Sequence, residues 1–333
     1  MKKALIYHTD INPATATPDD LDVLNQAKFV SGVLTRLGYE PVTRPFALNF
    51  PDKCNPATYN PQTILMEIGL IQPQIIFNLV EVVNGQEPLN YIAPEVFEQA
   101  KVPYAGCTHE AFLKVADKLT AKRIMRINGI PTPAFLTPYG LQETSLGGKA
   151  FLVKSATQHA SQGLETTLCR SKGGLRRRFE EKGKDFFAEE YIEGREFNIS
   201  VMGRVQQPKV LPIAEMMFQD WEKGKPKIVG YSAKWDPNCR EYKSTEVRRF
   251  DFPEADQDLI HQLETICRDC WNIFDLRGYA RIDFRVSEQG QPYVLEINAN
   301  PCISPDAGFI VATERAEMTH EQTIKEILEA SLN

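Results

Sequence analysis

Two strand-like segments near the carboxyl end constrain this chain more than any other feature. Residues 281–286 and 293–298 alternate in polarity and are joined by a short polar turn, which predicts a β-hairpin. Asp283 and Glu296 fall on opposite strands, and Asn298 lies two residues after Glu296, on the same side of its strand. Oxygen ligands suit Mg²⁺, which takes few protein carboxylates and completes its shell with phosphates and water. The hairpin therefore predicts a magnesium site.

Arg281 shares a face with Asp283 and is placed to contact a transferring phosphoryl group. The alternative is an ordinary hairpin with solvated charges, but Glu296 and Asn298 interrupt an otherwise apolar strand. The pattern Arg-x-Asp … Leu-Glu-x-Asn-x-x-Pro resembles the metal-binding end of the ATP-grasp superfamily, and within it the D-alanine–D-alanine ligase branch. The likeness runs from about Gln74 to the C-terminus. It implies ATP and Mg²⁺ as cofactors, with two ions bound and Mn²⁺ as a substitute.

Composition narrows the function classes. A chain of 333 residues is long enough for two or three domains. Its net charge of −6 is unlike that of a general nucleic-acid binder, so no nucleic-acid partner is expected. No apolar run approaches membrane-spanning length, so we expect no membrane association and a cytoplasmic location. Among the seven cysteines, the pair Cys267 and Cys270 has CxxC spacing but lies on the apolar stripe of a helix, which favours a buried core role over a metal or redox site.

The order of elements predicts α/β and α+β architecture. Strands and helices alternate over residues 1–113, which predicts a parallel sheet with helices on both sides. Residues 114–192 predict a small central α+β domain, and residues 193–333 a C-terminal α+β domain. Together these make an ATP-grasp fold with an N-terminal parallel-sheet substrate domain, a central lid and a catalytic, metal-binding domain. The predicted strands are 3–7, 41–45, 74–79, 102–105, 149–155, 165–169, 184–190, 196–202 and 209–215, and the predicted helices are 20–37, 61–71, 88–100, 117–128, 174–182, 254–274 and 319–332.

Polar residues follow the strands of the first domain. Ligands gather at the carboxyl ends of the strands in such sheets. This rule places His8, Asp10, Asn78 and Glu81 near a candidate substrate crevice, although each alone is more often a polar loop residue.

Lys154 ends an apolar strand and is followed by a small polar loop that contains Ser161 and Gly163. A lysine there can neutralise phosphate charge, and backbone N–H groups of the loop can cap the terminal phosphate. By itself, a strand-end lysine before an ordinary loop is the simpler interpretation. The arrangement is similar to the phosphate-covering loop of the ATP-grasp central domain. The resemblance implies that Lys118, early on its helix, supplies a second phosphate-contacting lysine.

Residues 186–196 resemble the nucleotide hinge of that family. The resemblance implies that Glu189 accepts from the adenine amino group, that the backbone of Ile192 meets the ring edge and that Glu196 binds the ribose hydroxyls. A carboxylate can accept both ribose hydroxyl protons. The alternative, an acidic exposed turn, suits Glu193 better than Glu196, which begins an alternating strand.

The substrate residues of the resembled branch are replaced here. The Ser-x-Glu segment that follows the first strand in that branch has no match here. In that branch a tyrosine follows the catalytic loop lysine, whereas in this chain Trp235 follows Lys234. Cys302 stands in place of a turn glycine. Asp306 lies where a serine would meet a substrate carboxylate, and an aspartate there should repel a carboxylate and attract a basic group.

The sequence thus predicts an ATP-dependent carboxylate–amine ligase that joins an amino acid or similar small acid to an amine through an acyl phosphate. Its catalytic residues would be Arg281 and Lys234, and Trp235 and Asp306 would contact substrate. Two alternatives stay open: a D-alanine–D-alanine ligase proper in cell-wall precursor synthesis, and a small-molecule kinase or non-catalytic nucleotide-binding module. Dimers are common in the resembled family, so a homodimer is an expectation.

Overall fold

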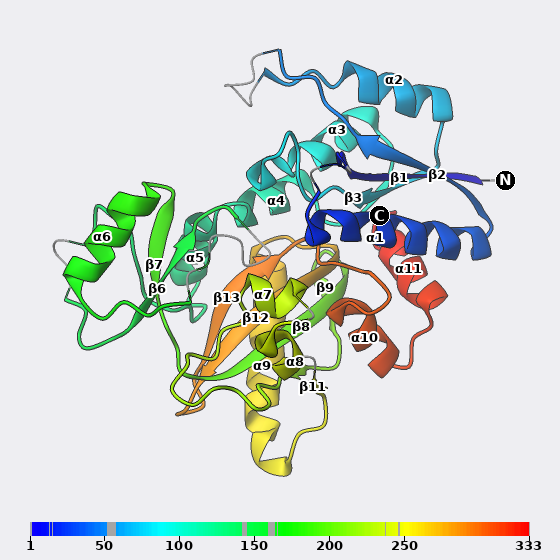
Figure 1. Cartoon of the computed structure of the whole chain (residues 1–333). Helices are drawn as coiled ribbons and strands as arrows, with labels where there is room; N and C mark the ends of the chain where they lie inside the picture. Colours follow the sequence, from blue (N-terminus) through cyan, green and yellow to red (C-terminus); the bar gives the residue numbers. More distant parts are fainter. Residues whose placement is uncertain are drawn as a thin grey trace.

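The structure of the protein is a computed structural model that describes residues 2–12, 14, 16–51, 58–141, 145–158, 164, 166–236, 238–245 and 247–332. It contains three sheets, each with helices packed against it (Figure 1). The predicted α/β and α+β architecture is confirmed. No helix in these described ranges is long and apolar enough to cross a membrane.

The N-terminal sheet is parallel, as predicted, with strand order β2-β1-β3-β4. Because side chains alternate along β1, Leu5 and Tyr7 pack toward α2 and α3, whereas Ala4 and Ile6 pack toward α1 and α11. The elements of this region are β1 (Lys2–Thr9), α1 (Pro18–Arg36), β2 (Tyr39–Phe46), α2 (Gln62–Ile71), β3 (Ile75–Leu79), η2 (Glu87–Leu89), α3 (Ile92–Ala100) and β4 (Tyr104–Ala105), with α11 (His320–Glu329) added from the far end of the chain.

A small central lobe, green at the left of Figure 1, is built on an antiparallel sheet of order β5-β7-β6. Its elements are β5 (Phe135–Leu136), β6 (Phe151–Ser155), α6 (Lys172–Lys182) and β7 (Phe186–Glu190). The predicted strand 165–169 is wrong for its described residues, since only Cys169 pairs, in an isolated bridge with Phe151. Thr166 and Thr167 are exposed and offer no apolar face to pack on the lobe.

The C-terminal sheet is antiparallel with order β11-β10-β8-β12-β13, and β9 pairs with β8. The predicted strand 209–215 is two strands, because Pro212 between them cannot donate a ladder hydrogen bond. Cys267 and Cys270 are fully buried in the core under this sheet, as predicted. The elements are β8 (Gly194–Arg204), β9 (Gln207–Val210), β10 (Ala214–Met216), α7 (Tyr231–Trp235), α8 (Arg240–Ser244), β11 (Arg248–Arg249), η3 (Glu254–Asp256), α9 (Gln257–Ile273), β12 (Gly278–Ser287), β13 (Pro292–Asn298) and α10 (Gly308–Arg315).

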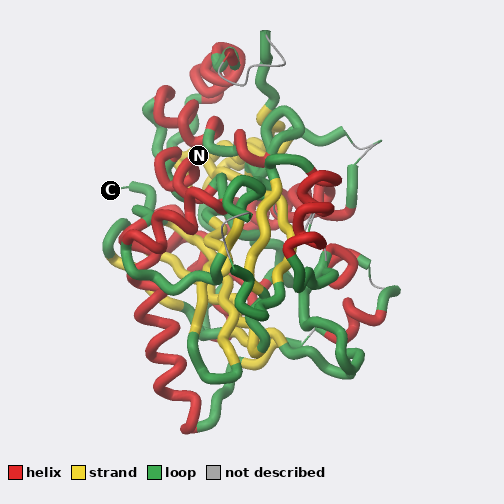
Figure 2. The backbone as a smooth tube through the Cα atoms, turned by 90° about the vertical axis from the view of Figure 1, so that its left-hand side faces the viewer, coloured by secondary structure: helices red, strands yellow, loops and turns green. Residues whose placement is uncertain are grey.

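Each sheet lies inside one of the three predicted domain ranges, which supports that division. The proposed limit at residue 113 falls inside α4 (His109–Val115), however, and α5 (Lys118–Ile127) follows directly. Phe112 and Met125 of these helices pack in the core of the C-terminal sheet rather than in that of the central lobe. Because α4 and α5 pack there, we propose that the central lobe begins after α5. Figure 2 shows the strands in the middle of the molecule with helices around them.

Candidate active site

One face of the C-terminal sheet is apolar and the other is polar. Phe197, Ile199, Ile282 and Phe284 are fully buried in one core with α9. Side chains alternate along a strand, so the intervening residues point to the opposite face. The register aligns them across three strands: Glu196 and Asn198 of β8, Arg281, Asp283 and Arg285 of β12, and Glu296 and Asn298 of β13.

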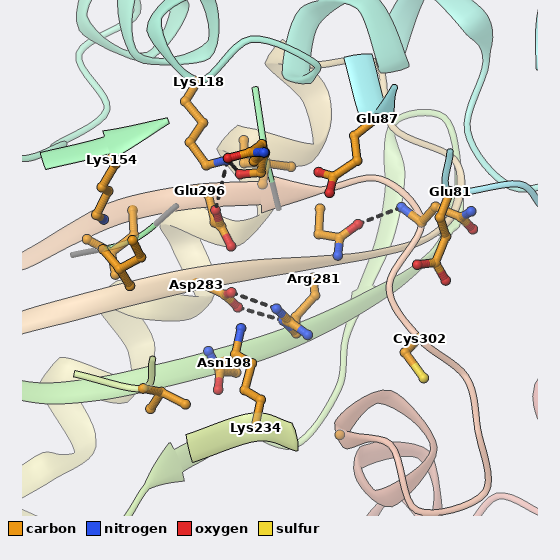
Figure 3. Close-up of a pocket in the computed structure, with 18 of the residues that line it drawn as sticks. Glu81, Glu87, Lys118, Lys154, Asn198, Lys234, Arg281, Asp283, Glu296 and Cys302 are labelled. Atoms are coloured by element: carbon orange, nitrogen blue, oxygen red, sulfur yellow. Dashed lines mark hydrogen bonds and ion pairs between the residues drawn. The ribbon is translucent and has the colours of Figure 1, made fainter. Parts of the chain in front are cut away.

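This polar face forms one wall of a cavity of about 680 Å³ that reaches all three sheets. The volume is in the range typical of small-molecule and cofactor sites. Figure 3 shows Lys118 and Lys154 approaching from one side, Arg281 and Asp283 in the middle, and Glu81 and Cys302 on the other side. Twelve of the predicted site residues line it: Glu81, Lys118, Lys154, Glu189, Ile192, Glu196, Lys234, Arg281, Asp283, Glu296, Asn298 and Asp306.

The lysines at the nucleotide side share acidic partners. The carboxylate of Glu189, 2% exposed, forms ion pairs with Lys154 and with Lys122, a residue that the sequence analysis missed. Burial alone would lower the pKa of Lys154, but its acidic neighbours, Glu189 first, raise it. Burial lowers the pKa of Lys118, whose Nζ lies 3.9 Å from Oε2 of Glu296. In this structure Glu189 therefore holds two lysines in place, and its contact with adenine stays a prediction.

The segment predicted to be the nucleotide hinge is held by Arg285, which the sequence analysis also missed. Its guanidinium donates to the carbonyl oxygen of Ile192 at 3.0 Å and to Oε2 of Glu196 at 3.2 Å. Burial, and after it the charge of Asp283, raise the pKa of Glu196, while Arg285 opposes the shift. Arg285 is two residues after Asp283 on the same strand face, so the alternation that identified the hairpin also pointed to it.

The predicted metal ligands lie on neighbouring strands. Asp283 is opposite Glu296 in β13 and opposite Asn198 in β8, and both oxygens of Asp283 accept from Arg281, at 2.7 and 2.8 Å. A carboxylate has lone pairs left for a cation after accepting two such bonds. No group of three His, Cys, Asp or Glu suited to a metal occurs in the described part of the chain. Two carboxylates with the amide oxygens of Asn198 and Asn298 nevertheless fit Mg²⁺, which keeps part of its shell as water and phosphate.

Lys234 of α7 faces the same wall (Figure 3). Burial, and after it the positive charge of Arg281, lower its pKa, while the carboxylates of Glu296, Asp283 and Glu196 oppose the shift. Lys234 and Arg281 together supply positive charge beside the hairpin carboxylates, an arrangement suited to stabilising negative charge on a bound group.

Not every predicted residue reaches the cavity. His8 and Asn78 are buried at the ends of β1 and β3, outside the cavity wall, and each bonds backbone beside it: His8 Nδ1 lies 2.8 Å from the carbonyl oxygen of Thr9, and Asn78 accepts from the amide of Val80. The structure therefore does not bring them to the site. Ser161, Gly163 and the side chain of Trp235 lie outside what the structure describes.

Comparison with known proteins decides the family. The family described as D-ala D-ala ligase C-terminus matches residues 143–329, more than half of the chain. The chain belongs to the D-alanine–D-alanine ligase-like family. The predicted resemblance is thereby confirmed. Members are ATP-grasp enzymes, and the protein is an ATP-dependent ligase that forms amide bonds between a carboxylate and an amine.

Individual relatives of this ligase are distant. "Uncharacterized protein y4sG" of Sinorhizobium fredii is 28% identical over 264 residues, which cover 77% of this chain and 74% of that protein. D-alanine–D-alanine ligase of Moorella thermoacetica is 24% identical over 324 residues, 93% of this chain and 94% of that protein. The solved structure of D-alanine–D-alanine ligase from Bacillus anthracis complexed with ATP covers 100% of this chain and 97% of its own, with a TM-score of 0.70 and 17% identity. The last likeness shows the shared fold.

Proposed function

We propose that this ligase activates a small carboxylic acid, an amino acid or a close relative, as an acyl phosphate and joins it to an amine other than D-alanine. The observation that best supports ATP-dependent activation is the approach of Lys118 to Glu296 in one cavity, because a lysine proposed to bind phosphate then lies beside a carboxylate proposed to bind the metal. Asp283, Glu296 and Asn298, with Asn198, would hold Mg²⁺, which would neutralise phosphate charge when bound.

In the proposed reaction a carboxylate oxygen of the acid attacks the γ-phosphorus of ATP, and the bond to ADP breaks. The amine then attacks the acyl carbonyl carbon, loses a proton and expels phosphate. Lys118 and Lys154 would bind the phosphates, while Arg281 and Lys234 stabilise charge at the transferring group. Exclusion of water from the occupied cavity would protect the acyl phosphate from hydrolysis.

The substrates follow from the part of the cavity that differs from the family pattern. The ligand set of the nucleotide side is complete, whereas the Ser-x-Glu segment and the tyrosine after Lys234 are missing. A D-alanine–D-alanine ligase proper is the second candidate, favoured by relatives such as the Moorella thermoacetica enzyme. A homodimer and a cytoplasmic location stay proposals.

Pairwise mixtures of amino acids and small amines with ATP and MgCl₂, followed by phosphate release, test the proposal. We expect release only when both an acid and an amine are present, and little release with D-alanine alone. Phosphate retained on an acceptor would identify a kinase. The absence of product from every mixture would favour a non-catalytic nucleotide-binding module. Efficient D-alanyl-D-alanine formation would show that the second candidate is correct.

A further inference from the structure

Arg285 of β12 lines the cavity, yet protein groups occupy all three nitrogen atoms of its guanidinium. Its Nε donates to the carbonyl oxygen of Ile192 at 3.0 Å, and its Nη1 donates to the carbonyl oxygen of Lys227 at 3.0 Å and to Oε2 of Glu196 at 3.2 Å. Its Nη2 lies 3.4 Å from the hydroxyl oxygen of Tyr191. Because these partners use the donors of Arg285, this residue can act on a ligand only through them.

Glu196 keeps one carboxylate oxygen for a ligand. Its Oε2 accepts from Arg285, whereas its Oε1 accepts from no residue in the part of the chain that the structure describes. Glu196 lines the cavity from β8, and an ionised carboxylate accepts hydrogen bonds on both oxygens. The bond to Arg285 therefore fixes the side chain and leaves Oε1 available.

A second cation competes for this carboxylate. Lys234 lies close enough to lower the pKa of Glu196, after the larger effects of burial, which raises it, and of Arg285, which lowers it. No ion pair joins Lys234 to Glu196 within the described ranges, whereas one joins Arg285 to Glu196. Pairing of Glu196 with Lys234 would occupy both a predicted ribose acceptor and a predicted catalytic cation. The bond to Arg285 therefore favours the arrangement in which both stay available.

Arg285 also connects the predicted nucleotide hinge to the loop between β10 and α7. The carbonyl oxygen of Lys227 in this loop accepts from Arg285, and the amide of Lys227 donates to the hydroxyl oxygen of Tyr191 at 3.0 Å. The guanidinium carbon lies 5.3 Å from the centre of the Tyr191 ring, within the range of a cation–π contact. One arginine thus holds the predicted adenine edge at Ile192, the predicted ribose acceptor and one wall of the cavity.

We propose that Arg285 is a positioning residue for nucleotide binding, which holds Glu196 so that its free oxygen accepts from the ribose hydroxyls and thereby sets the preference for a ribonucleotide. The inference rests on the proposed function, in which ATP occupies this part of the cavity. The bonds of Arg285 form without a ligand, so ATP does not have to order the carboxylate, and such preorganisation increases affinity. A sugar without hydroxyl groups leaves the carboxylate unpaired and should bind more weakly.

The first test compares two nucleotides on the unaltered enzyme. Isothermal titration calorimetry with MgCl₂, and without acid or amine, measures the affinity for ATP and for 2′,3′-dideoxy-ATP. We expect ATP to bind about tenfold to a hundredfold more tightly, the effect of hydrogen bonds to a charged group. Equal affinity for the two nucleotides would overturn the inference without the use of any variant.

The second test repeats the comparison with Arg285→Met and Arg285→Lys. Arg285→Met has no donor for Glu196, so its affinities for the two nucleotides should lie within about threefold of each other. Arg285→Lys keeps the charge without the planar fork and should recover part of the preference. Both variants should raise KM for ATP while KM for the acid partner stays unchanged. Arg249→Met, which removes an arginine paired with Glu215 in the same sheet but outside the cavity wall, is the matched control and should keep the full preference.

A double variant tests whether Arg285 acts through Glu196. Glu196→Gln should itself lose most of the preference, and adding Arg285→Met should remove little more, because the two changes disable one interaction. Independent, additive losses would contradict this role. A variant that was only less stable would have a lower melting temperature but would still prefer ATP.

The remaining outcomes separate the two proposals. A full preference for ATP in Arg285→Met would overturn the inference, and so would the failure of both Arg285 variants to fold, since Arg285 would then be a structural residue. Loss of the preference in Arg285→Met without phosphate release from any mixture would support the role of Arg285 while contradicting the proposed ligation. Phosphate release with an unchanged preference would leave the ligation intact and contradict the role of Arg285.

Discussion

The two ends of the cavity are built in different ways. At the nucleotide and metal end, charged residues bind one another: Glu189 holds Lys122 and Lys154, and Arg281 holds Asp283. At the substrate end, Asp22 of α1 accepts from the thiol of Cys302 at 2.9 Å and from the hydroxyl of Ser304 at 2.8 Å, so contacts there join the N-terminal region to the loop after β13. The charged side chains of the first end therefore hold one another without a ligand, whereas the contacts of the second end are hydrogen bonds between the N-terminal region and the loop after β13.

This difference separates the residues proposed to bind ATP from the residues proposed to bind the substrates. ATP and its counterions are the same for every member of an ATP-grasp family, so one arrangement of charges serves them all. Substrates differ, and the end of the cavity that we propose for them is lined by residues of α1, the loop after β3, β11 and the start of α10.

The largest effect should come from the shared hairpin. Glu296→Gln keeps the size of the side chain but removes one of the two carboxylates that fit Mg²⁺, so turnover should fall about a thousandfold or more. Phosphate release measures turnover, and the melting temperature should change little. Glu288→Gln, in the exposed turn of the same hairpin, is the matched control. Retention of near-normal activity by Glu296→Gln would mean that this hairpin does not bind the metal.

The buried ion pairs of the nucleotide end should control stability. Glu189→Gln leaves Lys122, 1% exposed, without its counterion and should cost about 3–5 kcal/mol of the free energy of unfolding. Urea unfolding measures this cost. Combining the change with Lys122→Met should cost less than the sum of the single changes, because the unpaired charge is then removed. Strictly additive costs would show that the two side chains do not interact.

The hairpin of the metal end could be predicted because its signal is local. Alternation along 281–298 predicted two strands with Asp283 and Glu296 on opposite strands, and the structure contains this hairpin, with the two residues paired. Asn198 and Lys122 were missed, although each lies on the same face of its element as a predicted residue. Asn198 is two residues after Glu196 on a strand, and Lys122 is four residues after Lys118 on a helix.

The substrate end could not be predicted in the same way. Arg248 of β11, which lines the cavity, meets the start of α10 only because β11 joins the edge of the C-terminal sheet by pairing with β10, a contact that no local period encodes. His8 and Asn78 followed the rule for strand ends, but both side chains turned to the backbone beside them. Proximity in the fold, rather than residue type, decided these cases.

A pH profile should distinguish the lysines of the nucleotide end. Because burial lowers the pKa of Lys118, its charge is lost as pH rises before that of an ordinary lysine. The pKa of Lys154 is raised, so Lys154 stays charged over that range. The value of kcat/KM for ATP, which reports the free enzyme, should therefore fall at alkaline pH.

The variant Lys118→Gln should lower kcat/KM at neutral pH. It should also remove one ionisation from the fall of kcat/KM at alkaline pH, and the fall that remains would belong to Lys234, whose pKa is also lowered. Lys149→Gln, which removes an exposed lysine paired with Glu190, should leave the profile unchanged. An unchanged profile in Lys118→Gln would assign the alkaline limb to another group.

The smallest effect should come from the rim of the substrate end. Asp306 is exposed, so its charge is screened, and removal of a rim charge seldom changes binding by more than about 1 kcal/mol. Asp306→Asn should lower KM for a carboxylate-bearing amine about threefold or less, since a charge that repels carboxylates is lost. Initial rates at 0.05 M and 0.5 M salt should show the difference shrinking at the higher concentration, where the screening length is roughly 4 Å. A rise in KM, or a new preference for neutral amines, would show instead that Asp306 binds a basic group of the substrate, as its replacement of a serine first suggested.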